Sequence, residues 1–167
     1  MAATPADLMA MLAGLGIATT TVEHPPLFTV EQSRALRGDI PGAHTKNLFL
    51  KDRRDALFLV TAEEDAAIDL KRLHAVIGAS GRLSFGRAEL LMEVLGVPAG
   101  AVTLFAAIND TAGRVSVVLD RRLMANRQIN CHPLVNTATT TIAAVDLCAF
   151  LRATGHQPAV LAISADL

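Results

Sequence analysis

Two apolar runs joined by a charged turn constrain the fold of this chain most strongly. "TKNLFLKD" covers residues 45–52 and "ALFLVTA" covers residues 56–62, with only "RRD" between them. Each run has the length of one strand, and such a short polar connection places two strands side by side as a hairpin. Both runs are apolar at most positions, so the hairpin is predicted to be covered on both faces. The chain must therefore build a sheet with other elements packed against it.

The N-terminal part predicts helix, strand and helix in turn. Thr4-Pro5-Ala6-Asp7 combines a hydroxyl cap, a proline at the first helical position and a carboxylate three residues after the cap. "TTTVEH" at residues 19–24 is a β-branched run and predicts a short strand. A second helix is predicted at residues 29–38, with Thr29 as its cap and Gly38 as its stop.

The rest of the chain mixes helix and strand signals without strict alternation. Helices are predicted at residues 70–78, with Asp69 as cap, at 86–96 and at 145–155. Strands are predicted at residues 81–85, 128–133, 137–143 and 158–164, and a second hairpin at 101–120 around "NDTAG". This pattern predicts one mixed α/β domain over residues 1–167, with a mixed, partly barrel-like sheet and helices packed outside.

Composition and charge exclude several classes of protein. The chain is 51% hydrophobic, which suits a globular core, yet it has no run of about 18 apolar residues that would span a membrane. The net charge of −1 disfavours a general binder of phosphate backbones. Two cysteines cannot form a disulfide framework, and the N-terminus has no signal-peptide pattern, so the cytoplasm is the expected compartment.

The stretch "INCHPLVNTATTTI" at residues 129–142 raises the question of what Cys131 and His132 do side by side. Thiolate and imidazole are zinc ligands, and they also form nucleophilic pairs. Neighbouring residues of a strand point to opposite faces, however, and no C-x-x-C or H-x-x-x-H pattern supplies further ligands. The spacing therefore favours a buried core thiol for Cys131 and disfavours a metal site.

Three further features each have a functional and a structural interpretation. Lys46 shares a strand face with Leu48 and Leu50, so its ammonium either lies at the rim of a pocket or extends to solvent. The glycines at 96–100 either let a backbone approach a ligand or end a helix. The threonines at 137–141 either line a polar pocket or reflect strand propensity.

Taken in order, the motifs of the chain resemble the YbaK-like family of prolyl-tRNA editing domains, and its freestanding ProX-type branch in particular. The likeness covers about residues 20–160. The motifs that carry it are "HTKNLFLKD", "FLVTAEEDAAIDLKRL", "LSF", "LGVPAGAVTLFAAIND", "VSVVLD", "CHPLVNTATTTI" and "FLRATGHQP". The combination is specific, although each piece alone is not.

The resemblance implies a mixed α/β, barrel-like fold that hydrolyses the ester between a wrong amino acid, alanine first, and the tRNA for proline. It implies Lys46 as the catalytic residue and no metal or other cofactor. The substrate-binding residues that it implies are Asn47, Gly100, Ala101, His132, Asn136 and Thr137. The implied partners are the acceptor end of that tRNA and, transiently, prolyl-tRNA synthetase, with no membrane.

One position departs from the family, and two alternative functions stay open. The family's Gly-x-x-x-Pro loop begins here at Gly100 but ends in Leu104 instead of proline. The same fold would also suit removal of cysteine or serine, because pocket width cannot be derived from one sequence. A non-catalytic nucleic-acid-binding module is the third reading, which the scarcity of aromatic residues (4%) disfavours.

Overall fold

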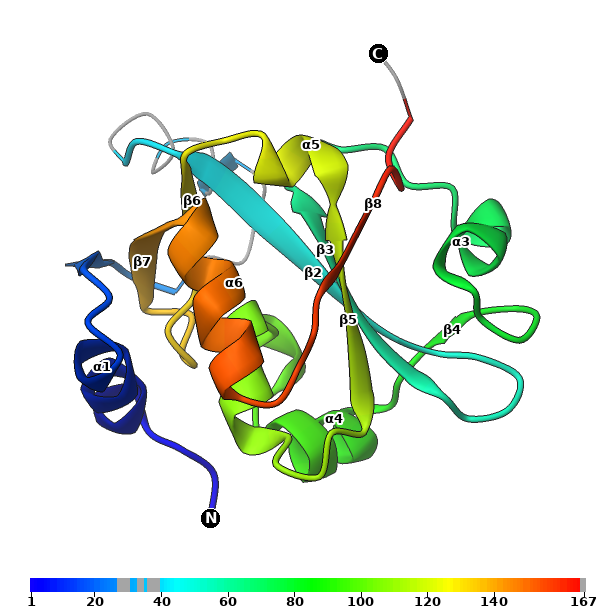
Figure 1. The fold of residues 1–167 in the computed structure, drawn as a ribbon, viewed down its shortest axis with the longest axis horizontal. Helices are drawn as coiled ribbons and strands as arrows, with labels where there is room; N and C mark the ends of the chain where they lie inside the picture. Colours follow the sequence, from blue (N-terminus) through cyan, green and yellow to red (C-terminus); the bar gives the residue numbers. More distant parts are fainter. Residues whose placement is uncertain (27–30, 33–34, 36–39, 166–167) are drawn as a thin grey trace.

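A mixed sheet of eight strands organises the computed structural model, which describes residues 1–26, 31–32, 35 and 40–165. The strands run in the order β1-β7-β6-β2-β3-β5-β8, and β4 pairs with β2 outside this path (Figure 1). The strands are β1 (Thr19–Glu23), β2 (Ala43–Lys51), β3 (Leu57–Glu63), β4 (Ser84–Phe85), β5 (Val115–Asp120), β6 (Gln128–Cys131), β7 (Ala138–Ala143) and β8 (Ala159–Leu161). The predicted mixed α/β fold is confirmed.

Helices lie around this sheet, and their ends follow the capping signals of the sequence. They are α1 (Pro5–Gly14), α3 (Leu70–Ile77), α4 (Ala88–Leu95), α5 (Arg121–Met124), α6 (Ala144–Ala153) and the 3-10 helices η1 (Ala99–Ala101) and η2 (Leu104–Asn109). Thr4 and Asp7 form the predicted capping box of α1. Gly78 and Gly96 end α3 and α4 in the left-handed conformation, with φ of 74° and 65°. The helix predicted at 29–38 falls largely outside the described residues.

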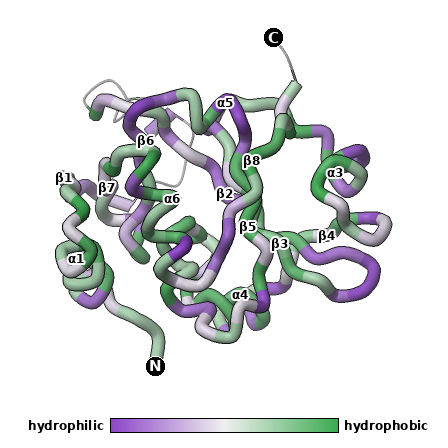
Figure 2. Tube along the Cα trace, in the orientation of Figure 1, coloured by the Kyte–Doolittle hydropathy of each residue, from purple (hydrophilic) through white to green (hydrophobic). Residues whose placement is uncertain are grey.

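The predicted hairpin is present, and it forms the middle of the sheet. β2 and β3 pair antiparallel from Thr45 opposite Glu63 to Lys51 opposite Leu57. On its other side β2 pairs with β6 through residues 43–44 and with β4 through residues 50–51. Between these pairings, no described strand borders β2 on that side. Figure 2 shows the contrast between the hydrophobic strands β3 and β5 and the hydrophilic turn that joins β2 to β3.

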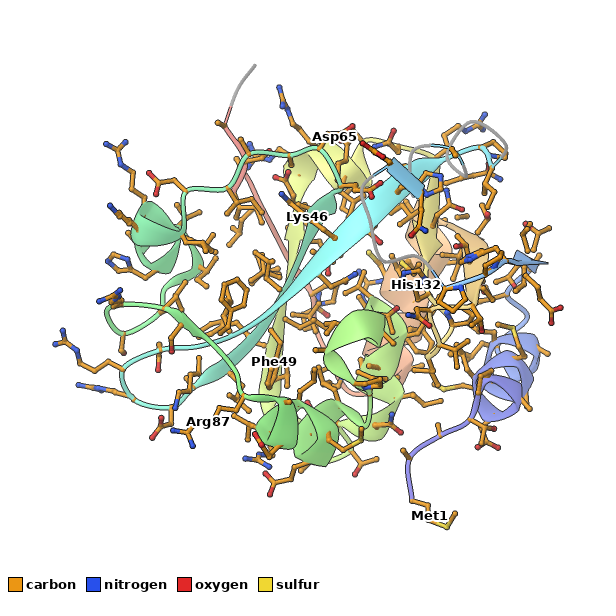
Figure 3. The ribbon with its side chains drawn as sticks, turned by 180° about the vertical axis from the view of Figure 1, so that it is seen from behind. Met1, Lys46, Phe49, Asp65, Arg87 and His132 are labelled. Atoms are coloured by element: carbon orange, nitrogen blue, oxygen red, sulfur yellow. The ribbon has the colours of Figure 1, made fainter. Side chains whose placement is uncertain are left out.

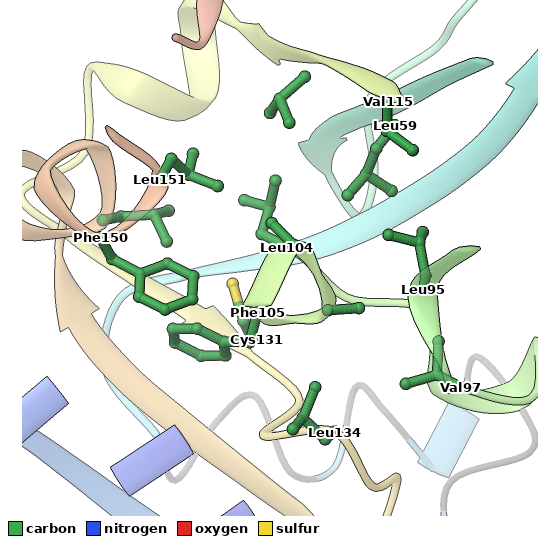
Figure 4. Close-up of a cluster of buried hydrophobic side chains, with 14 of the residues drawn as sticks. Leu59, Leu95, Val97, Leu104, Phe105, Val115, Cys131, Leu134, Phe150 and Leu151 are labelled. Atoms are coloured by element: carbon green, nitrogen blue, oxygen red, sulfur yellow. The ribbon is translucent and has the colours of Figure 1, made fainter. Parts of the chain in front are cut away.

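Each face of the sheet has its own hydrophobic core, because side chains alternate along the strands. The larger core receives Phe49, Leu57 and Leu59 and packs against α1, α4, η2 and α6. Within it, the rings of Phe105 and Phe150 meet edge to face with centroids 5.4 Å apart (Figure 4). The smaller core lies on the opposite face, where Leu50, Phe58, Val60 and Val118 pack against Leu73 of α3 and against Ile163.

The prediction of a second hairpin at residues 101–120 is wrong. Residues 104–109 form the 3-10 helix η2, and β5 pairs in parallel with β3 and β8. Thr103 begins η2 by accepting a hydrogen bond from the Phe105 amide, and residues 104–107 are all buried. A continuous apolar run looks the same in sequence whether it forms a buried helix or a buried strand. Here the run was predicted as a strand, and its residues 104–109 form a helix.

Candidate active site

Lys46 lies inside β2, three residues after its first residue. It pairs with Ala62 of β3 and faces the smaller core with Leu48 and Leu50. Its half-buried side chain ends at the loop after β3, where Nζ donates a hydrogen bond to the carbonyl oxygen of Ala66. An ammonium has three donors and Lys46 uses one of them among the residues that the structure describes, which leaves donors for a ligand.

His132 follows directly on β6 and lies on the same face of the sheet as Lys46. β2 and β6 are parallel, with His44 opposite Asn130, and a step of two residues along each strand preserves the face. Figure 3 shows the two labelled side chains on either side of β2. The Nδ1 atom of His132 donates to the carbonyl oxygen of Ala138 at 3.0 Å. In the neutral ring the lone pair then lies on Nε2, where it can accept a hydrogen bond.

Cys131 points to the opposite face, as predicted from strand alternation. It is 2% exposed and packs in the larger core beside the Phe105 and Phe150 side chains (Figure 4). Burial raises the pKa of its thiol to about 12, against a smaller opposing effect of the hydrogen bond from Thr45. Cys131 is therefore a neutral core residue, and it forms no catalytic pair with His132.

Because the pKa of the Cys131 thiol is raised, the free energy of unfolding should change with pH in the alkaline range. The folded state holds the Cys131 proton between pH 9 and about 12, whereas the unfolded chain releases it, so unfolding becomes easier as pH rises through this window. We expect Cys131 to account for a loss of roughly 1.4 kcal/mol of unfolding free energy per pH unit there. Urea unfolding of wild type and Cys131→Ala at pH 8 and pH 10 measures it. Equal pH dependence of the two proteins would show that the thiol is not buried in this way.

Asn47 points away from Lys46, because it is the next residue of the same strand. Its Oδ1 accepts a hydrogen bond of 2.7 Å from the hydroxyl of Thr61, its partner on β3. The Asn47 side chain thereby cross-links β2 and β3 on the face of the larger core. Strand alternation accounts for this separation, since the two residues are adjacent, and a substrate contact by Asn47 stays a prediction.

Two of the predicted loop residues lie next to each other. A Cβ atom placed on Gly100 would be 3.7 Å from Nδ2 of Asn136, so the exposed backbone of η1 adjoins the loop after β6. Ala101 is 3% exposed and packs in the larger core. Leu104, the residue that replaces the family proline, is completely buried as the first residue of η2.

Sequence reasoning missed His24, which follows β1. The rings of His24 and His132 have centroids 6.4 Å apart. His24 Nδ1 donates to the Pro25 carbonyl at 2.8 Å, so in the neutral ring Nε2 accepts the hydrogen bond of 2.8 Å from the Thr139 hydroxyl. The only sequence signal was a histidine at the end of a predicted strand, a position too common to indicate a site.

An open pocket of about 780 Å³ adjoins His24 and Thr137. Helix α1 forms one wall, and the end of β1 with the loop before β7 forms the other. Thr137 is exposed, and its carbonyl oxygen accepts the backbone hydrogen bond of His24 at 2.9 Å. His24 and Thr137 line this pocket, and the ring contact with His24 is what connects His132 to it.

Comparison with known proteins shows the family of this chain. Residues 24–150 match the family model of the aminoacyl-tRNA editing domain. The chain belongs to this family. It is 41% identical to the prolyl-tRNA synthetase associated domain-containing protein 1 of Danio rerio, over 93% of this chain and 85% of that protein. It is 35% identical to the prolyl-tRNA editing protein ProX of Acetoanaerobium sticklandii, over 89% of this chain and 91% of that protein.

Solved structures confirm the fold of this editing domain. A crystal structure of a hypothetical protein superposes with a TM-score of 0.72 at 20% identity, covering 95% of this chain and 99% of that one. A second, described as a candidate trans-editing enzyme for prolyl tRNA synthetase, gives 0.70 at 20% identity, over 96% and 98%. Among the described residues, no group of three or more potential ligands is arranged to hold a metal ion, and no helix is long and apolar enough to cross a membrane.

Proposed function

We propose that this editing domain acts in trans as a deacylase that removes alanine from mischarged tRNA for proline. The single observation that carries the proposal is the placement of Lys46 and His132 on one face of the sheet, beside the part of β2 that no described strand borders. The names of the related proteins, a prolyl-tRNA editing protein among them, support the choice of tRNA.

The reaction proposed is addition of water across an ester. Water attacks the carbonyl carbon, the bond to the ribose oxygen breaks, and the products are free alanine and a tRNA with its terminal hydroxyl restored. An aminoacyl ester is already activated, so a fixed water and a stabilised oxyanion suffice without a metal or a covalent intermediate.

Two side chains divide this work. The Lys46 ammonium, held through Ala66, stabilises the developing oxyanion or a phosphate of the terminal nucleotide. The His132 ring is fixed by the hydrogen bond from Nδ1 to the Ala138 carbonyl. Its Nε2 lone pair orients the water, and the ring itself forms one wall of the amino-acid pocket. The 2′-hydroxyl of the terminal adenosine assists in activating the water, and prolyl-tRNA synthetase is a transient partner.

Selectivity is the first test of this proposal. A hydrophobic synthetase pocket discriminates between amino acids that differ by one methylene by only about 1 to 3 kcal/mol of binding free energy. A second, smaller pocket is therefore needed to hydrolyse the ester of the smaller amino acid. We expect alanyl-tRNA to be hydrolysed faster than the cysteinyl, seryl and prolyl esters of the same tRNA. Single-turnover rates for the four esters measure this order. Faster loss of cysteine or serine would assign the same fold to another amino acid.

A further inference from the structure

Asp120, the last residue of β5, is a buried carboxylate that the proposed reaction does not use. It has no exposed surface, and its Oδ1 accepts a hydrogen bond of 3.2 Å from the Ile163 amide. Its Oδ2 has no hydrogen-bond partner within the described part of the chain. Although Asp120 precedes α5, its side chain does not cap that helix. A buried carboxylate oxygen without a partner is costly, so its presence calls for a physical reason.

The register of the sheet places Asp120 on the same face as Lys46. Lys46 is paired with Ala62 across β2 and β3. Thr61 is paired with Leu119 across the parallel strands β3 and β5, so the next residue of each strand brings Asp120 beside Ala62. Strands β2, β3 and β5 lie side by side in this order (Figure 1). Lys46, Ala62 and Asp120 therefore form one row across three strands.

Ala62 stands between Lys46 and Asp120 in this row, and its side chain is only a methyl group. This row lies at the end of the smaller core, to which Val60 and Val118 contribute from the same face. The loop after β3 is hydrogen-bonded to the C-terminal segment, since the Ala165 amide donates to the Ala67 carbonyl. Ala67 is next to Ala66, whose carbonyl accepts from Lys46. Charges in such a half-buried place are weakly screened, so they interact over more than one strand spacing.

We propose that Asp120 is a positioning residue for Lys46: its unpartnered carboxylate oxygen is the counter-charge that keeps the ammonium directed along this face. The proposal rests on the proposed function only for the catalytic role of Lys46, because the coupling of the two charges belongs to the free protein. Other charged or titratable groups lie around Lys46 on the same face, the adjoining loop and helix α5: His44, His132, Glu64, Asp65 and Arg122. The experiment must separate Asp120 from them.

The chain offers an unusually clean probe, because it contains only three lysines, Lys46, Lys51 and Lys71. Labelling lysine with ¹³C at Cε gives one NMR signal for each, and each signal reports the electrostatic surroundings of its own ammonium. In Asp120→Asn the amide oxygen can still accept from Ile163, so the variant removes the charge and keeps the shape. We expect the Lys46 signal to move away from its wild-type chemical shift at neutral pH, while the other two signals stay in place.

Asp110→Asn is the matched control. Asp110 is also buried, 2% exposed, but it accepts from the Arg114 and Val115 amides and pairs with His156 at 2.8 Å, away from the Lys46 row. Its loss should lower stability and leave the Lys46 signal unchanged. Glu64→Gln and Asp65→Asn test the nearer acidic groups. An unmoved Lys46 signal in Asp120→Asn, or an equal shift in the Asp110 variant, overturns the proposal.

A reciprocal variant keeps the test possible if Asp120→Asn does not fold. The coupling is mutual, so Lys46→Met should move the ¹³C signal of the labelled Asp120 carboxyl at neutral pH. An Asp120 signal that does not change would contradict the coupling. Deacylation by Asp120→Asn provides the separate readout. If the NMR signals shift and the variant cleaves the ester as fast as wild type, the coupling stands and the positioning role in catalysis fails. If wild type itself does not cleave the ester, the proposed function fails and the NMR signals alone decide the coupling.

Discussion

Replacing Lys46 with alanine should lower kcat/KM for alanyl-tRNA by about 100- to 1,000-fold, the usual cost of removing one donor from a developing oxyanion. The side chain is half-buried and, within the described part of the chain, makes one hydrogen bond, to the Ala66 carbonyl, so the sheet should persist. Steady-state kinetics separate two roles. A lower kcat at constant KM indicates oxyanion stabilisation, whereas a higher KM at constant kcat indicates a contact with phosphate in the ground state.

Lys51→Ala is the matched control for this prediction. Lys51 lies on the same strand, but it pairs at 3.5 Å with the exposed Asp55 at the other end of β2. Such an exposed pair contributes little, and the control should keep kcat/KM within about twofold of wild type. Turnover of Lys46→Ala close to that of Lys51→Ala, with circular dichroism unchanged in both, would remove Lys46 from the reaction.

Replacing His132 with alanine should change selectivity as well as rate. If the ring forms a wall of a pocket sized for a methyl side chain, its loss makes room for proline. Cleavage of prolyl-tRNA should then rise relative to alanyl-tRNA by about tenfold, the scale on which a few carbon atoms are discriminated. The ratio of kcat/KM for the two esters is the quantity to measure. An unchanged ratio with both rates lowered equally would make His132 catalytic or structural, and the selective wall would lie elsewhere.

Leu104→Pro should act in the opposite direction. Position 104 is the first residue of η2, where the fixed φ of proline is compatible with a helix, and a stiffer loop should sharpen discrimination. The leucine side chain is completely buried, so the substitution should also cost about 1 to 3 kcal/mol of unfolding free energy. Combined with His132→Ala, it should partly restore the ratio if both act on one wall. Strictly additive effects on that ratio would indicate independent walls.

The local rules predicted those parts of the fold that local chemistry determines. The capping box at Thr4 and the left-handed glycines Gly78 and Gly96 fix helix ends through their own backbone, and the hairpin follows from two runs and a short turn. The parallel pairing of β5 with β3 and β8 joins residues far apart in the chain, and no local pattern specifies it. The 3-10 helix at residues 104–109 was predicted as a strand, because residues 104–107 are all buried and a continuous apolar run shows neither the helical nor the strand periodicity.

The site followed a similar division. Strand alternation alone separated Cys131 from His132, and the structure confirms that separation. Strand alternation also turns Asn47 away from Lys46, a consequence that the motif "KN" conceals when it is treated as one unit. His24 and Asp120 reach the region only through sheet pairing, to β7 and β3 respectively, so their place depends on tertiary structure.

One measurement tests the central claim most directly: release of free alanine from alanyl-tRNA for proline, with a catalytic amount of the protein and a chelator present. The account predicts that many esters are cleaved by each protein molecule, that alanine and uncharged tRNA appear in equal amounts, and that the chelator changes nothing. The account would be contradicted if the protein bound the charged tRNA but the ester was lost only at the rate of spontaneous hydrolysis. That result would favour a nucleic-acid-binding module without catalysis.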